Sequence, residues 1–158
     1  MIPRGVLGLL FFLGLTFCAA WVGARFLPGE WYAGLRKPVW NPPDWIFAPV
    51  WTLLYTLMAV SAWLVWHPKG ARAVALGLGL YVLQLLFNAM WSWLFFGLHR
   101  TGLALAEILL LWCCITAMVI VFWKLDWRAG TLLLPYLLWV SFATVLNATL
   151  WWLNRAST

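Results

Sequence analysis

The sequence predicts an all-α integral membrane protein, a single domain over residues 1–158 with five transmembrane helices and a long first loop. Of its 158 residues, 66% are hydrophobic and 9% are charged, whereas soluble domains average about 45–50% and about 25%. A chain of this length cannot build a core large enough to bury so much apolar surface, so the surplus must face lipid. The apolar residues also fall into five stretches, each close to the roughly 20 residues that span a bilayer as a helix.

The five predicted spans are separated by polar, glycine and proline residues. They cover residues 3–23, 44–66, 73–96, 102–123 and 130–152. The first stretch has some features of a secretory signal, because Arg4 precedes an apolar run, but the run extends to Gly23 and is long enough to span. We therefore expect a retained helix. The later connections are short, with a turn predicted at residues 67–70, so consecutive spans from the second onward should be antiparallel.

The first connection, residues 24–43, is longer and holds four prolines together with Trp31, Tyr32 and Trp40. A turn at residues 28–30, a short interfacial helix over residues 30–37 and a stop at Pro38 are predicted. Long loops rich in aromatic residues and proline are usually functional. Anchoring of the aromatic rings at the lipid headgroups is the alternative, and the sequence does not separate the two.

A stripe of polar and aromatic residues follows one face of the third span. Its members recur at steps of three and four: Tyr81, Gln84, Asn88, Trp91 and Phe95. Amide side chains in hydrocarbon are costly unless they are paired, so this face should point into the bundle. Hydrogen bonding between helices and a ligand-facing wall both explain such a face.

Similar stripes mark two other spans. On the second span the stripe comprises Trp51, Tyr55 and Met58, and on the fifth it comprises Tyr136, Trp139, Ala143 and Asn147. The small side chain of Ala143, between two larger ones, leaves room for a planar guest or for a neighbouring helix.

Several function classes are disfavoured. The sequence has no glycine-rich phosphate loop, no His/Cys set with metal-ligand spacing and no Ser/His/Asp constellation with a base in a suitable place. We therefore expect no metal, no resident cofactor and no conventional hydrolase. The net charge of +6 comes from single basic residues between apolar runs, so they fit anchoring at membrane interfaces and not nucleic-acid binding.

Three residues inside the spans support further hypotheses. Glu107 is the only acidic residue deep in a span, which makes it a functional-site candidate unless its side chain extends to the interface. Ala75 and Gly79 on the third span form a small-xxx-small pair, which predicts a homodimer through this helix.

Three blocks of residues, in order along the chain, resemble the tryptophan-rich sensory protein/translocator protein (TspO) family. The blocks are Trp31-Tyr32-x-x-Leu35-x-Lys37-Pro38-x-Trp40-x-Pro42-Pro43 followed by Trp51 and Tyr55, then Gln84-x-x-x-Asn88-x-x-Trp91-x-x-x-Phe95, and then Pro135-Tyr136-x-x-Trp139 followed by Ala143 and Asn147.

The resemblance implies a five-helix membrane receptor or translocator, often dimeric, with a role in transport, sensing or regulation. It implies binding of porphyrins and, in some members, of cholesterol and synthetic benzodiazepine-type ligands, in a pocket capped by the first loop. Carried over residue by residue, the ligand-binding candidates are Trp31, Trp40 and Pro42 in the cap and Trp51, Asn88, Trp91, Trp139, Ala143 and Asn147 in the pocket. A tyrosine that sterol-binding members carry after Asn147 is missing, which disfavours a sterol ligand.

Two alternatives remain open. Some family members are reported to degrade protoporphyrin in light, with tryptophans matching Trp51 and Trp139. An excited porphyrin can oxidise nearby indoles without a designed active site, so we do not class the chain as an enzyme on this ground. The other alternative is a structural or partner-binding membrane protein in which the aromatic stripes are ordinary packing.

Overall fold

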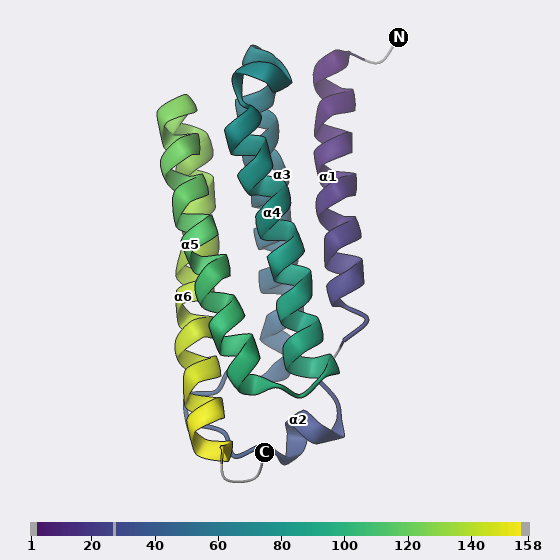
Figure 1. Ribbon diagram of the computed structural model, residues 1–158. Coiled ribbons are helices and arrows are strands. Elements are labelled where there is room, and N and C mark those ends of the chain that lie inside the picture. The colour runs from purple at the N-terminus through teal and green to yellow at the C-terminus, as the bar shows by residue number, and fades with distance from the viewer. Residues whose placement is uncertain (1–2, 27, 156–158) are drawn as a thin grey trace.

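The computed structural model describes residues 3–26 and 28–155, and five long helices stand side by side in it (Figure 1). They are α1 (Arg4–Gly23), α3 (Phe47–Ala73, preceded by the 3₁₀ turn η1, Asp44–Ile46), α4 (Ala75–Ser92, extended by the π-helical turn η2, Trp93–Gly97), α5 (Thr101–Leu125) and α6 (Trp127–Asn154). With these turns included, all five are long and apolar enough to cross a bilayer. The predicted all-α class and the five membrane helices are confirmed.

The order of the helices around the bundle differs from their order in the chain. Helix α1 packs on α3 and α4, α3 packs on α6, and α5 packs on both α4 and α6, so the ring runs α1, α3, α6, α5, α4. The closed interior holds large side chains with no exposed surface, among them Met58, Tyr81, Met118 and Tyr136. Helix α1 therefore covers the α3–α4 side of the bundle, opposite the packed pair α5 and α6.

The turn predicted at residues 67–70 is wrong. Helix α3 continues to Ala73, and the chain reverses at Val74, whose backbone leaves the helical region (φ −120°, ψ 17°). A proline removes one N–H from the helical ladder, which weakens a helix without obliging it to end. The second span is therefore longer than predicted, and the third begins at Ala75 and not at residue 73.

The α5–α6 connection is shorter than predicted, because a single residue, Asp126, separates the two helices. Its carboxylate accepts a hydrogen bond of 2.9 Å from the Arg128 N–H and so caps α6. Gly130 allows the close approach that this corner needs: a Cβ atom there would lie 2.8 Å from the Trp123 backbone.

The first connection passes under one end of the bundle and contains a short helix, α2 (Glu30–Gly34) (Figure 1). The predicted helix over residues 30–37 ends early, since Leu35 is already extended (φ −68°, ψ 145°). Gly34 is a weak helix former, and Pro38 biases the residue before it toward extended backbone. The backbone of residues 28–43 thus runs beneath the ends of the long helices (Figure 1).

Candidate functional site

A cavity of about 630 Å³ lies at the end of the bundle nearest α2. All five long helices contribute to its walls, and Pro28 and Tyr32 of the first connection reach it as well. The aromatic members of the lining are Phe17, Trp21, Phe26, Tyr32, Phe47, Trp51, Tyr55, Trp91, Phe95, Phe96, Trp139 and Phe142. The cavity is therefore an aromatic chamber with few polar groups.

The stripes predicted on three spans converge on this cavity. Six of the predicted binding residues line it: Trp51, Asn88, Trp91, Trp139, Ala143 and Asn147. Their role in holding a ligand stays a prediction, but their common location follows from the way α3, α4 and α6 meet.

The three residues predicted for the cap lie outside the cavity lining. The Trp31 ring stacks on His99, with centroids 4.1 Å apart and planes 14° apart. Trp40 packs edge-on against Phe142 at 5.8 Å, and Pro42 does not touch the cavity either. The two tryptophans fix the connection to the bundle, and Tyr32, the neighbour of Trp31 in sequence, lines the cavity.

The amides of the α4 stripe are held in a network that joins three helices. The Tyr55 hydroxyl donates to Asn88 Oδ1 (2.7 Å), and Asn88 Nδ2 donates to the Tyr136 hydroxyl (3.2 Å). The Tyr136 hydroxyl in turn donates to Gln84 Oε1 (2.8 Å). Hydrogen bonding between helices, one of the two explanations of the stripe, is therefore present, and Asn88 is also part of the cavity wall.

A second polar link fixes an indole in the wall. Trp91 Nε1 donates to Asn147 Oδ1 (3.0 Å), and Asn147 Nδ2 donates to the Thr101 carbonyl (2.9 Å). The Trp91 ring also stacks on Phe95 at 5.1 Å. Because the N–H edge and one face of the Trp91 ring are constrained, the ring is preorganised in its position before any ligand arrives.

The connection is tied to the far end of α6 by one asparagine. The Arg36 N–H donates to Asn154 Oδ1 (2.9 Å), and Asn154 Nδ2 donates to the Arg36 carbonyl (3.0 Å). The buried Tyr32 hydroxyl donates to Asn41 Oδ1 at 3.2 Å. Burial raises the pKa of Tyr32 above its ordinary value of 10.0, so this hydroxyl remains a neutral donor at physiological pH. Sequence reasoning did not single out Asn154.

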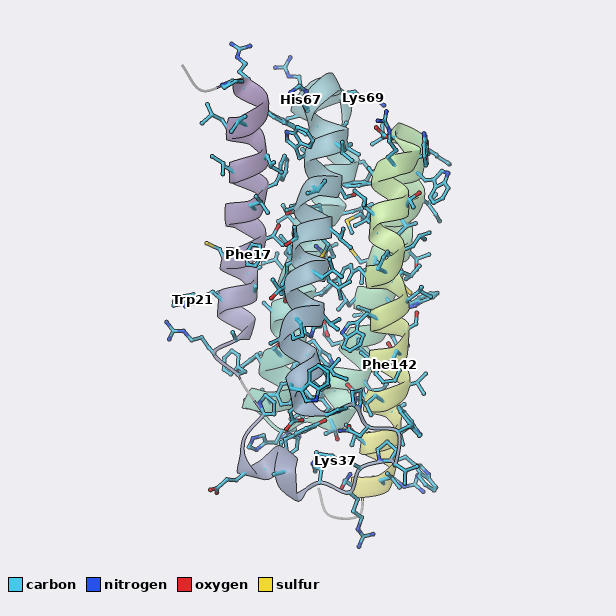
Figure 2. All side chains as sticks on the ribbon, turned by 180° about the vertical axis from the view of Figure 1, so that it is seen from behind. Phe17, Trp21, Lys37, His67, Lys69 and Phe142 are labelled. Atoms are coloured by element: carbon cyan, nitrogen blue, oxygen red, sulfur yellow. The ribbon has the colours of Figure 1, made fainter. Side chains whose placement is uncertain are left out.

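Helix α1 supplies a wall that the sequence analysis missed. Phe17 and Trp21 line the cavity although their side chains are 39% and 61% exposed. Figure 2 shows them on α1, with Phe142 on α6 on the other side of α3. The Arg25 guanidinium lies 3.9 Å above the Trp21 ring, which places a cation at this rim. The spacing of Phe17, Trp21 and Ala24 at steps of four and three is the sequence signal that marks this wall.

Two other charged residues, Lys37 and Glu107, lie outside the cavity lining. Lys37 Nζ donates to the Ala33 carbonyl (3.2 Å) and lies over the Tyr32 ring, and Lys37 does not line the chamber. Glu107 is buried, and neither of its carboxyl oxygens has a hydrogen-bond partner among the described residues. In that same part of the chain, no group of three or more His, Cys, Asp or Glu residues is arranged to hold a metal ion.

The predicted dimer face is free of intrachain packing at its key positions. Ala75 and Gly79 are exposed on α4, and a Cβ atom at Gly79 would have no neighbour within 4 Å. A homodimer through this face stays a prediction.

Comparison with known proteins identifies related chains. The family model described as TspO/MBR family matches residues 10–153. The chain is 41% identical over 138 residues to protein CrtK of Rhodobacter capsulatus, covering 87% of this chain and 86% of that protein. It is 42% identical over 138 residues to the tryptophan-rich sensory protein of Cereibacter sphaeroides, covering 87% and 85%. It is also 42% identical over 135 residues to the human translocator protein, covering 82% and 80%.

Proposed function

This chain belongs to the TspO/MBR family, and from that premise we propose that it binds porphyrins and related hydrophobic ligands in the cavity beside α2. Family membership and the five apolar helices make it an integral, multi-pass membrane protein of the translocator and sensory type. Ligand binding in the cavity would serve transport, sensing or regulation.

The size and lining of the cavity are the observation that carries this proposal. Its volume of about 630 Å³ falls within the roughly 300–1,000 Å³ typical of small-molecule sites. Trp51, Trp91 and Trp139 present indole rings to it from three helices. Flat aromatic surfaces stack on planar ligands, so a tetrapyrrole or a compact benzodiazepine-type aromatic fits this chemistry.

The charges around the cavity favour one orientation of a porphyrin. Arg36 and Lys37, two basic residues of the first connection, do not line the cavity, whereas Asp44 does. An acidic wall at Asp44 repels carboxylates, and the Arg25 guanidinium over Trp21 attracts them. The propionate groups would therefore leave the chamber on the α1 side, beside Arg25.

A cavity-filling variant with a matched control tests the proposal. Ala143→Phe adds a ring inside the cavity, while Val145→Phe adds the same ring two residues away, where the side chain is 58% exposed and outside the lining. Protoporphyrin is titrated into each purified protein, and bound porphyrin is followed by its absorbance shift. We expect Ala143→Phe to weaken binding by about tenfold or more, the scale of one to several kcal/mol for overpacking, and Val145→Phe to leave it unchanged.

Equal binding in both variants would contradict the cavity assignment. A chain that acts only as a structural or partner-binding protein would, in addition, gain no thermal stability from porphyrin, because only a ligand that binds the folded state raises it.

The second candidate function is light-dependent porphyrin degradation. It is favoured by the presence of both Trp51 and Trp139 in the cavity wall, where an excited ligand would contact both indoles. Illumination of the bound complex should then give defined products at a rate above that of porphyrin with free tryptophan. Equal rates would mean unspecific photo-oxidation.

A further inference from the structure

A second hollow, of about 530 Å³, lies on the outside of the bundle between α1 and α4. It occupies the half of α1 that starts at Arg4, and it shares no lining residue with the porphyrin cavity. Its floor is formed by Gly8, Phe12 and Tyr81, which are buried, and exposed Phe11 and Val82 form its rims. We call this feature the α1–α4 groove.

The depth of the groove follows from a glycine on α1. A Cβ atom at Gly8 would lie 2.1 Å from the Trp66 ring, so only glycine lets the indole enter the floor. The polar atoms at the floor are already paired: the Tyr81 and Thr16 hydroxyls are hydrogen-bonded to each other, and Thr16 Oγ1 donates to the Phe12 carbonyl (2.7 Å). An occupant of the groove therefore meets an almost entirely apolar surface, which suits a hydrocarbon chain.

A positively charged side chain, Arg4, lies where the groove reaches the end of the bundle. Arg4 lines the groove and is exposed. Arg72 is also exposed at this end, whereas Lys69 lies on the side of α5 (Figure 2), where its Nζ donates to the Leu125 carbonyl (2.6 Å). Among the described residues, the acidic residue at this end is Asp126, which pairs with Arg128 at 3.6 Å. Arg4 is thus available to an anionic group at headgroup depth.

We propose that the α1–α4 groove binds an anionic phospholipid of the surrounding bilayer, with one acyl chain between α1 and α4 and the phosphate at Arg4. The apolar floor and the exposed Arg4, which forms no ion pair with the described residues, are the complement of such a lipid. The bound lipid fastens α1, whose main packing partners among the described residues are α3 and α4, to the rest of the bundle. This proposal does not depend on what the porphyrin cavity binds.

Native mass spectrometry of the detergent-purified full chain, with phosphatidylglycerol and phosphatidylcholine of identical acyl chains, tests the proposal. Phosphatidylglycerol should bind about fivefold or more tightly, the gain expected from one basic side chain at an anionic headgroup. Arg4→Gln should remove this preference. Arg100→Gln should retain it, because Arg100 is an exposed arginine next to His99, on which Trp31 of α2 stacks.

Two variants of α4 test the path of the acyl chain. Val82→Trp fills the groove and should weaken both lipids, whereas Leu83→Trp, at a neighbouring position that is equally exposed but outside the lining, should weaken neither. Inorganic phosphate should not displace the lipid, and dihexanoyl phosphatidylglycerol should bind more weakly than its long-chain form.

Three results would overturn the proposal. They are equal affinity for the two headgroups, an unchanged preference in Arg4→Gln, and equal binding of short and long chains. The proposal would also be overturned if the wild type showed no lipid preference and Val82→Trp abolished a dimer. That result would assign the groove to contact between two copies of the chain.

Discussion

Replacing Asn154 with alanine is expected to release the first connection from α6. The substitution removes both hydrogen bonds to the Arg36 backbone, at 2.9 and 3.0 Å, which join residues 118 positions apart. Each such bond contributes about 0.5–1.5 kcal/mol net, so opening of the connection should become easier by about 1–3 kcal/mol. At about 1.4 kcal/mol per factor of ten, the open state becomes about 5- to 140-fold more populated.

Hydrogen–deuterium exchange is the assay for this change. Exchange of the Arg36 amide follows the population of the open state, so peptides covering residues 30–40 should exchange faster by that factor while those from the middle of α6 keep their rate. Thr149→Ala is the control, because the Thr149 hydroxyl donates to the Val145 carbonyl within its own helix. Unchanged exchange at residue 36 in the Asn154 variant, or equal acceleration in the control, would refute the argument.

Three further predictions follow from packing and charge. Gly8→Ala should lower the free energy of unfolding by about 1–3 kcal/mol, because its Cβ would overlap the Trp66 ring. Gly14→Ala is the control and should leave the free energy of unfolding unchanged, because a Cβ there would have no neighbour within 4 Å. Thermal denaturation measures both. Glu107→Met should raise stability by about 1–3 kcal/mol, since it removes two buried oxygens that lack partners among the described residues, and a lower melting temperature would contradict this. Arg25→Gln should weaken protoporphyrin binding about fivefold or more but leave binding of its uncharged dimethyl ester unchanged; equal losses for both ligands would argue against a charge contact.

The helices were predictable because hydropathy alone determines which segments can enter a bilayer. The stripe of Gln84, Asn88 and Trp91 also predicted an inward face, because unpaired amides are costly in lipid. The end of the second span was not predictable: Pro68 favours a helix end, but a proline weakens a helix without obliging it to stop, and α3 continues to Ala73.

The parts of the site that the sequence did not indicate depend on long-range packing. Asn154 lies beyond the last apolar stretch, and nothing local indicates that its amide bonds the Arg36 backbone. Trp31 and Trp40 were expected in the cap from the family resemblance, and whether they cap a ligand stays a prediction. Their rings pack on His99 and Phe142 outside the cavity lining, and Tyr32 of the same connection lines the cavity. The rotation of α2 about its axis determines which of its adjacent aromatic residues faces the cavity. That rotation cannot be read from the amino-acid composition.

The central claim is that porphyrin binds between indoles in the cavity beside α2. The most direct measurement is a protoporphyrin titration, followed by porphyrin fluorescence, of the double variant Trp51→Phe, Trp139→Phe beside the control Trp127→Phe, Trp152→Phe, whose indoles are exposed and outside the lining. With about 0.5–1.5 kcal/mol for each stacking contact, the first double variant should bind at least about fivefold more weakly than the wild type, and the control should match the wild type. Non-saturating association, equal in all three proteins, would mean that porphyrin only partitions into the detergent and would contradict the claim.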